Sequence, residues 1–376
     1  MVAISLAAAE SNLGCEVQVV SYHFPKGDAR LAAALATVPN IGNVKLEYLP
    51  PLTKVERFLA RGARRRLDSV VEQFDLIHLH GVWDPLIYAV GSLAARHKKP
   101  YVFTAHAALY PWAMSQSRLK KKIAMAMGYR RMLNGASFLH YLTQDEKRLT
   151  ANLQLTPPVH VLPNGIFPEE FASLPSRGTF RRAHPEFSDA KLILYLGRLS
   201  YTKGLDLLAE AFAIVSKQFP GARLIIVGPD YGERARFESQ IAQLGIASRV
   251  HILGPLFAGD KLAALVDCDC FCLPSRQEGF SVAVTEAMAC GAPVVISPEC
   301  HFPEVQENQA GIVVELNPAS VARGIGSILG DLSAAKVMGQ NGRELIQSHF
   351  TWPKIAEQMV QKYAEVLNAP AIGARA

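Results

Sequence analysis

The chain has 376 residues, of which 49% are hydrophobic, and this length predicts two domains, each with its own core. No run of 18 apolar residues occurs, which argues against a membrane-spanning helix. The apolar N-terminus lacks a basic flank and contains Glu10, so it does not resemble a signal peptide. We therefore expect a cytoplasmic protein. The net charge of +6 is uneven, since residues 1–176 hold 20 Lys and Arg against 13 Asp and Glu.

Strand-like runs alternate with amphipathic helical segments along the chain. In the first half the predicted strands cover 16–21, 44–49, 75–81, 100–106, 137–142 and 159–165. In the second half they cover 191–198, 222–228, 249–254, 270–274, 293–297 and 311–315. Continuous apolar strands between helices indicate parallel sheets covered on both faces. We predict an α/β protein with two doubly wound Rossmann-like domains and a ligand cleft between them, at the carboxyl ends of the strands.

The domain boundary is predicted in 171–190, which is rich in Pro, Ser and Arg and has no periodicity. This gives an N-terminal domain over 1–176 and a C-terminal domain over 177–351. A last helix over 351–367 begins with Thr351 as a candidate N-cap. We expect this C-terminal segment, 352–376, to join the first domain.

Two basic runs with apolar residues between the charges account for the positive surplus, at 54–66 and 118–131. Both look helical. They are explained either by solvated helix faces or by attraction to an anionic membrane surface or a phosphorylated lipid. No aromatic and basic binding module is visible, so we expect no nucleic acid partner.

The segment LYLGRLSYTKGLD (194–206) places two cations beside a helix start. Arg198 follows a predicted strand directly, and Lys203 lies at the opening of the next helix. Cations beside a helix N-terminus suit a diphosphate. The glycine spacing and the Lys-Ser/Thr pair of a P-loop are absent, and surface charge is the alternative explanation.

The segment EGFSVAVTEAMACG (278–291) places two carboxylates around a helix start. Glu278 lies in a loop after a strand, Ser281 can cap the following helix, and Glu286 lies within that helix. The backbone N–H groups of Phe280 and Ser281 can face an anion, and the two carboxylates can accept hydrogen bonds from sugar hydroxyls. Arg198 and Lys203 would balance a carboxylate close to a phosphate.

Residues 191–315 resemble the C-terminal domain of the retaining glycosyltransferases of family 4 (group 1), which have the GT-B fold. The resemblance rests on GRLSYTKGLD, LIIVGPDYGE, HILGPLF and LPSRQEGFSVAVTEAMACGAPVV, in that order. It implies that Arg198 and Lys203 bind the donor diphosphate, that Glu278 faces the donor sugar and that Glu286 binds the ribose. The implied substrate-binding residues are Gly197, Gly228, Pro255, Leu256, Gly279, Phe280, Ser281 and Glu286, with Pro255 and Leu256 beside the base.

The N-terminal half resembles the same family most clearly in PYVFTAHAALYPWAMSQSRLKKK (100–122), where His106 corresponds to the active-site histidine. His78 and His80 are alternatives for that role. The resemblance also places a strand and a glycine-rich loop before the point where this sequence begins. Without them we expect an exposed sheet edge and core in the first domain, and impaired activity.

No metal or other cofactor is expected. Cys268, Cys270 and Cys272 alternate along a strand and cannot surround a tetrahedral ion. The DCD triplet at 267–269 has the form of a metal-binding DxD, but it leads directly into a strand.

Taken together, the resemblance implies a hexosyltransferase that uses a UDP- or GDP-sugar and a sugar or lipid-linked acceptor, in polysaccharide or glycolipid synthesis, with retention. The inner face of the membrane is the expected place for such an acceptor. A nucleotide-sugar epimerase and a non-catalytic nucleotide-sugar binder are the alternatives.

Overall fold

The computed structural model describes residues 1–22, 32, 35–50 and 60–369. It divides the chain into two compact units. Unit 1 consists of Met1–Asn164 with Trp352–Ala376, and unit 2 of Gly165–Thr351. Part of the basic run at 54–66 lies outside the described residues.

Unit 1 contains two parallel sheets within the described residues. The smaller pairs β1 (Gln18–Tyr22) with β2 (Lys45–Leu49), and the larger has the order β3-β4-β5-β6. Its strands are β3 (Ile77–His80), β4 (Tyr101–Thr104), β5 (Phe138–Tyr141) and β6 (Val159–Val161). The helical segments are α1 (Val2–Ser11), α4 (Arg61–Gln73), α5 (Pro85–Arg96), α6 (Pro111–Ser115), α7 (Arg118–Ala124), the π-helical turn η3 (Met125–Tyr129), α8 (Arg130–Asn134), α9 (Gln144–Thr150) and α18 (Trp352–Asn368).

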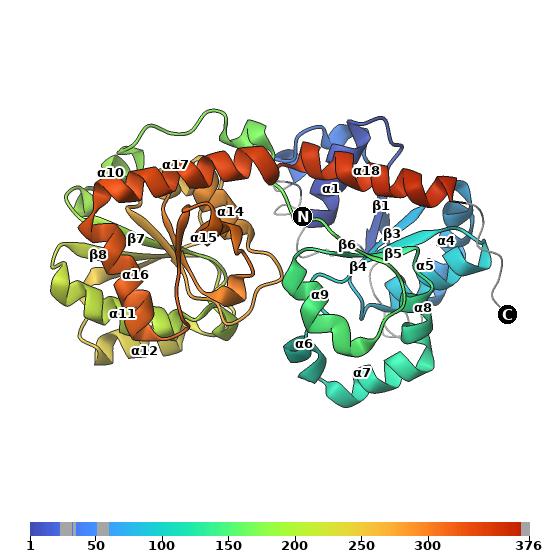
Figure 1. Ribbon diagram of the computed structural model, residues 1–376, viewed down its shortest axis with the longest axis horizontal. Coiled ribbons are helices and arrows are strands. Elements are labelled where there is room, and N and C mark those ends of the chain that lie inside the picture. The colour runs from blue at the N-terminus through green and yellow to red at the C-terminus, as the bar shows by residue number, and fades with distance from the viewer. Residues whose placement is uncertain (23–31, 33–34, 51–59, 370–376) are drawn as a thin grey trace. The chain divides into compact units, whose positions relative to one another are not determined.

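The last helix of the chain belongs to unit 1, where α18 packs along α1 (Figure 1). The Tyr363 hydroxyl on α18 lies 2.9 Å from the Glu10 carboxylate on α1. The helices α1 and α18 are therefore joined by packing and by a part-buried hydrogen bond.

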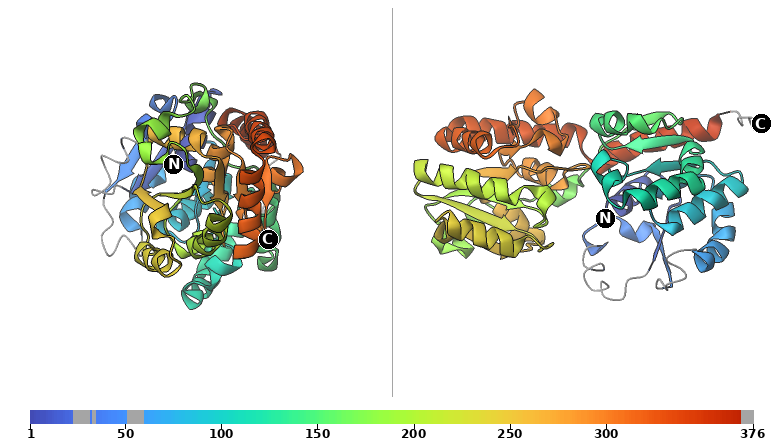
Figure 2. Two further views of the ribbon diagram at one scale, coloured as in Figure 1. Left: turned by 90° about the vertical axis from the view of Figure 1, so that its left-hand side faces the viewer. Right: turned by 90° about the horizontal axis from the view of Figure 1, so that it is seen from below.

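Unit 2 is built on one six-stranded parallel sheet with the order β12-β11-β10-β7-β8-β9. Its strands are β7 (Lys191–Leu196), β8 (Ala222–Val227), β9 (Val250–Gly254), β10 (Cys270–Leu273), β11 (Val294–Ile296) and β12 (Gly311–Val313). Its α-helices are α10 (Thr179–Ala183), α11 (Leu205–Gln218), α12 (Arg234–Gln243), α13 (Ala258–Asp267), α14 (Val282–Ala289), α15 (Glu304–Glu307), α16 (Pro318–Gly330) and α17 (Leu332–His349). Helices cover both faces of the sheet (Figures 1 and 2).

The doubly wound α/β prediction is confirmed, because every predicted strand overlaps an observed one. Burial explains the agreement. All six residues of β8 except Arg223 are buried, and β10 and β11 are buried throughout. A strand covered on both faces has no polar side to present, so its sequence reads as one apolar run.

The predicted boundary at 176/177 and the predicted linker over 171–190 differ from the structure. Unit 2 begins at Gly165, because Ile166 pairs with Thr351 and its N–H donates to the Phe350 carbonyl at 3.0 Å. The aromatic side chains of Phe171, Phe180 and Phe187 are buried in the core of unit 2. The segment therefore packs onto unit 2, and its Pro and Ser residues mark short helical turns.

Candidate active site

The predicted donor residues follow strands β7 and β10, which lie side by side in the middle of the unit 2 sheet. From β7 the chain continues outward to β8 and β9, and from β10 it continues in the opposite direction to β11 and β12. The loops after β7 and β10 therefore diverge at a topological switch point, where parallel sheets bind ligands. Arg198 and Lys203 lie on the first loop, and Glu278 to Ser281 lie on the second.

Arg198 presents an exposed guanidinium at this edge. Its backbone carbonyl accepts a hydrogen bond from the Tyr195 hydroxyl at 2.8 Å, which holds the turn after β7. Its side chain lies over the ring of Tyr231, 5.1 Å from the centroid. No carboxylate within the described residues pairs with it, so its charge is available to an anion.

Lys203 is paired with Glu278. Its Nζ contacts Glu278 Oε1, which also accepts a hydrogen bond from the Ser275 hydroxyl at 2.6 Å. Both charged side chains are nearly buried, at 12% and 8% exposure. The predicted balance between Glu278 and a cation is therefore a direct ion pair, which leaves Arg198 as the uncompensated charge of the set.

The helix α14 begins at the predicted position, with Ser281 in the N-cap place. The expected side-chain cap is wrong, since the Ser281 hydroxyl makes no cap hydrogen bond and is buried without a partner among the described residues. Gln277 Oε1 and Glu299 Oε2 are also buried without a hydrogen-bond partner among the described residues. Glu299 is part of the same group of loops, since its carbonyl accepts the Glu278 N–H at 3.1 Å. Buried polar atoms are normally hydrogen-bonded, so this group is typical of a site that a ligand completes.

The loop after β9 and the helix α14 supply the remaining predicted donor residues. Glu286 on α14 forms an ion pair with Lys261 on α13 at 2.7 Å. Pro255 and Leu256 follow β9, and Leu256 packs partly against the core. Lys261 was not found from the sequence, because its 25-residue separation from Glu286 closes only through the packing of two helices.

The glycine after β8 is required by the backbone. Gly228 has φ of +146°, and a Cβ atom there would lie 1.8 Å from the Gly197 carbonyl oxygen. The Gly228 N–H donates to the Gly254 carbonyl at 2.9 Å. The predicted residues Gly197 and Gly228 therefore bring the ends of two strands closer than any side chain would permit.

The two aspartates of the DCD triplet hold structure in place. Asp267 accepts hydrogen bonds from the Gly178 and Arg181 backbone N–H groups. Asp269 pairs with Arg177 at 2.7 Å and with Arg181 at 2.9 Å. These carboxylates fasten the segment at 176–190 to unit 2. Within the described residues, no group of three or more His, Cys, Asp or Glu side chains is arranged so that it could hold a metal ion.

In unit 1, His106 lies two residues after β4 in a left-handed turn. His106 and Ala107 have φ of 51° and 60°. The buried Glu146 holds this turn, because its Oε1 accepts the Ala107 N–H at 2.9 Å and its Oε2 accepts the Leu142 N–H at 2.8 Å. Burial raises the pKa of Glu146, and these two backbone hydrogen bonds oppose the shift.

The competing histidines are neighbours of His106 within one array. His106 Nε2 lies 2.9 Å from His80 Nδ1, and the two rings stack with centroids 5.2 Å apart. His80 stacks in turn on His78 at 4.1 Å. Burial lowers the pKa of His106 to about 4 and holds the pKa of His80 well below its ordinary value, so these rings are neutral at pH 7.

A series of hydrogen bonds extends from this array to Tyr363 on α18 and to Glu10 on α1. It runs through Leu162 O, His140 Nε2 and Nδ1, Thr104 Oγ1, His78 Nε2 and Nδ1, Tyr363 OH and Glu10 Oε1, with successive partners 2.6–2.9 Å apart. Glu146, Tyr363 and Glu10 were not found from the sequence. Their partners lie far away along the chain, and no local pattern marks them.

The comparisons with known proteins decide the family. The profile of glycosyl transferases group 1 matches residues 176–345, and that of a glycosyl transferase 4-like domain matches 2–165. An uncharacterized glycosyltransferase of Methanocaldococcus jannaschii is 30% identical over 339 residues, which cover 86% of this chain and 85% of that protein. The chain is a group 1 glycosyltransferase.

This glycosyltransferase is also similar to phosphatidyl-myo-inositol mannosyltransferase of Mycobacterium tuberculosis, at 25% identity over 89% of this chain and 83% of that protein. Among solved structures, HepE from Anabaena in complex with UDP and glucose has a TM-score of 0.77 at 19% identity, covering 96% of this chain and 95% of HepE. Sucrose-phosphate synthase from Thermosynechococcus elongatus has a TM-score of 0.75 at 21% identity, covering 97% and 92%. These structures confirm the GT-B fold. Over the described residues, the glycosyltransferase has no helix long and apolar enough to cross a bilayer.

Proposed function

We propose that this glycosyltransferase moves a hexosyl group from a UDP- or GDP-sugar to an acceptor hydroxyl, with retention at the anomeric carbon and without a metal ion. The observation that carries the proposal is the set of groups at the switch point of unit 2. There the loops after the neighbouring strands β7 and β10 carry Arg198, which pairs with no carboxylate among the described residues, and the start of α14 with the buried Ser281 hydroxyl. These groups suit an anion.

The donor diphosphate would be bound mainly by Arg198 and by the N–H groups at the start of α14. Lys203 already faces Glu278, so this pair contributes no net charge. A bound phosphate would compete with Glu278 for the ammonium group. The Glu278 Oε2 atom, which has no partner among the described residues, would then accept a hydrogen bond from a hydroxyl of the transferred sugar. Glu286, steadied by Lys261, would do the same for the ribose.

The chemical step would be a displacement on one face of the sugar, in which the departing phosphate takes the proton of the acceptor hydroxyl. The C–O bond to the diphosphate breaks, the new glycosidic bond forms, and negative charge accumulates on the leaving group. Stabilisation of that charge is the main catalytic contribution of such a site. Arg198 would provide it in place of a divalent ion, and the DCD carboxylates are already engaged by Arg177 and Arg181. His106 would contribute a neutral imidazole beside the transferred sugar.

The acceptor is proposed to be lipid-linked, in glycolipid or polysaccharide synthesis at the inner face of the membrane. A relative named as a phosphatidyl-myo-inositol mannosyltransferase supports this acceptor class. The segment α6–η3 of unit 1 supports it physically. Three large apolar side chains are exposed along it at four-residue spacing, Leu119 at 71%, Ile123 at 49% and Met127 at 75%.

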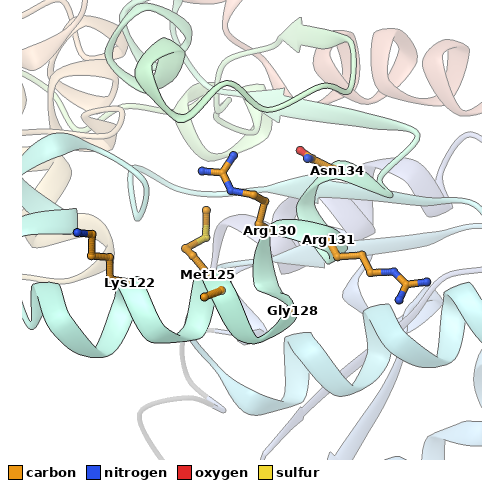
Figure 3. A pocket seen from close by; sticks show the side chains of 7 residues that line it. Lys122, Met125, Gly128, Arg130, Arg131 and Asn134 are labelled. Atoms are coloured by element: carbon orange, nitrogen blue, oxygen red, sulfur yellow. The ribbon is translucent and has the colours of Figure 1, made fainter.

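Basic side chains lie among these apolar ones. Lys122, Arg130 and Arg131 line a pocket of about 570 Å³ together with Met125 and Asn134 (Figure 3). Exposed apolar side chains with lysine and arginine around them suit the boundary between acyl chains and anionic headgroups. We propose that this segment contacts an anionic bilayer.

The donor proposal is tested by thermal shift with UDP, GDP, ADP and TDP in the presence of EDTA, followed by nucleotide release from the matching sugar. Stabilisation by UDP or GDP alone, undiminished by EDTA, is the expected result. Stabilisation that requires Mg²⁺ or Mn²⁺ would overturn the metal-independent site. Stabilisation by ADP or TDP alone, or by none of the four, would overturn the proposed donor.

The membrane proposal is tested by sedimentation with vesicles of phosphatidylglycerol and phosphatidylcholine. The double variant Leu119→Asp/Ile123→Asp should bind at least tenfold more weakly than the unchanged protein, and added salt should weaken both. Val337→Asp, which alters an exposed apolar residue on unit 2, is the matched control and should bind normally. Equal binding of the double variant and the control would overturn the assignment.

A further inference from the structure

The geometry around His106 gives two neighbouring residues a role that the sequence did not predict for them. We propose that His80 and Glu146 are positioning residues that fix the ring and the backbone of His106 for its contact with the transferred sugar. This inference rests on the proposed function, which gives His106 its role at the donor sugar.

The strand register brings His80 and His106 together. His80 is the last residue of β3 and pairs with Thr104, the last residue of β4, so its side chain lies next to the turn that follows. The contact from His80 Nδ1 to His106 Nε2 is 2.9 Å, and the rings are inclined by only 20°. One hydrogen bond and one stacking contact together restrict both side-chain torsions of His106.

The second ring nitrogen of His106 is left for a ligand. Within the described residues, its only hydrogen bond is the one from Nε2 to His80, and Nδ1 has no protein partner. A ring held at one nitrogen presents the other in a fixed direction. A sugar hydroxyl or a phosphate oxygen at Nδ1 would therefore meet an oriented imidazole.

Glu146 fixes the backbone of the same turn. His106 and Ala107 both have positive φ, and neither is glycine. Such a backbone conformation is unfavourable and persists only where surrounding contacts stabilise it. The fully buried Glu146 carboxylate does so by accepting the Ala107 N–H, while its other oxygen accepts the Leu142 N–H at the end of β5. Thr143 caps the helix that carries Glu146, accepting the Glu146 N–H at 3.1 Å.

The position of His80 is itself supported from the interior. His80 stacks on His78, whose two ring nitrogens lie 2.6 Å from Thr104 Oγ1 and 2.6 Å from Tyr363 OH. His78 therefore has no free rotation, and His80 is confined between a fixed ring and His106. The array is therefore held in the core at His78, and at its other end His106 Nδ1 has no partner among the described residues.

The test uses steady-state kinetics of His80→Asn and His80→Phe. An asparagine amide reaches about as far as Nδ1 of histidine, so His80→Asn should keep the contact and most of the activity. Phenylalanine keeps the stacking but removes the polar atom, and His80→Phe should lower kcat by roughly 10- to 100-fold with little change in the KM for the donor. Glu146→Gln, which keeps one acceptor oxygen, should lower kcat by less than Glu146→Leu does.

A double variant separates positioning from simple stability. In a His106→Ala background, His80→Phe should cause almost no further loss, because the ring that it orients is gone. Equal losses in both backgrounds, or an equal loss in His80→Asn and His80→Phe, would overturn the inference. The control is His97→Asn, a hydrogen-bonded histidine of unit 1 that pairs with Asp68 at 2.7 Å, and it should not alter kcat.

A spectroscopic readout keeps this inference separate from the proposed function. The ¹⁵N shifts of the His106 ring should indicate a hydrogen-bonded Nε2 in the unchanged protein and in His80→Asn, and a free Nε2 in His80→Phe. Unchanged His106 signals in His80→Phe would overturn the positioning role whatever the activity. The absence of nucleotide release from any nucleotide sugar, with the ring shifts as expected, would instead refute the proposed function alone.

Discussion

Replacing Glu10 with glutamine should stabilise the protein above pH 7 and leave its stability almost unchanged near pH 4.5. Glu10 is 7% exposed, and its carboxyl group faces Tyr363 on the C-terminal helix. Burial raises the pKa of Glu10 to about 7. At neutral pH a large fraction of the folded chains therefore holds this group as a neutral acid, which a glutamine side chain closely imitates in shape.

The polarity of the buried chain supports the same protonation state. The Leu162 carbonyl can only accept, so His140 carries its proton on Nε2, and its neutral Nδ1 accepts from Thr104. Following the chain, His78 then donates to Thr104 through Nε2, and its Nδ1 accepts the single proton of Tyr363. The hydroxyl oxygen of Tyr363 is thus left to accept from a protonated Glu10.

The magnitude follows from the difference between the two pKa values. The ordinary value is 4.5 and the folded value is about 7, and each unit corresponds to about 1.4 kcal/mol. Because the folded state binds the proton more tightly, stability falls as pH rises from about 4.5 to about 7. Above that range, ionisation of Glu10 has lowered the free energy of unfolding of the unmodified protein by roughly 3 kcal/mol. The Glu10→Gln variant cannot ionise at this position, so its free energy of unfolding is not lowered in this way.

The assay is thermal unfolding of both proteins at pH 5 and pH 8. A change of 1 kcal/mol shifts the Tm of a domain of this size by roughly 2–4 °C, so Glu10→Gln should melt about 6–12 °C higher than the unmodified protein at pH 8. Comparison at each pH cancels the buried histidines, which are common to both proteins. A variant that is less stable at pH 8 would refute the reasoning, because it would mean that Tyr363 stabilises an ionised carboxylate.

Three further substitutions test unit 2. Arg198→Ala should lower kcat by roughly 10²- to 10³-fold, and normal turnover with only weaker donor binding would show that Arg198 does not act on the leaving group. Ser281→Ala should leave Tm unchanged and raise the Kd for the nucleoside diphosphate in titration calorimetry, because its hydroxyl has no hydrogen-bond partner among the described residues. Gly228→Ala should lower Tm by 5 °C or more, since its Cβ would lie 1.8 Å from the Gly197 carbonyl oxygen, whereas Gly221→Ala, with open space around it, should not.

The strands and the nature of the fold were predictable, because burial acts on each strand separately. A run such as LIIV at 224–227 is apolar at every position since both of its faces are covered. The domain boundary was not predictable in the same way. The segment at 165–190 has the composition of a linker, yet Phe171, Phe180 and Phe187 bind it to unit 2. Isolated aromatic side chains among polar residues give no periodic signal, so their burial depends on the tertiary contacts that receive them.

The same distinction applies to the candidate site. Loops after strands indicated where Arg198, Glu278 and His106 would lie, because a parallel sheet gathers the ends of its strands on one edge. The partners of these residues depended on register and on long-range packing. The sequence indicated that Arg198 and Lys203 could balance a nearby carboxylate, and the structure shows that, of these two cations, it is Lys203 that contacts Glu278, across 75 residues.

His80 illustrates the point most sharply, since it looked like a rival of His106 for one role. In the structure the two rings form a single hydrogen-bonded pair, because β3 and β4 are parallel neighbours that end at the same level. Two histidines that are alternative candidates for one role in the sequence can therefore contact each other in the structure and contribute to that role together. A variant that removes either ring alone would not reveal which of them touches the sugar. In the double variant of His80 and His106, a loss of activity no larger than that of His106→Ala alone would show that His80 acts through His106.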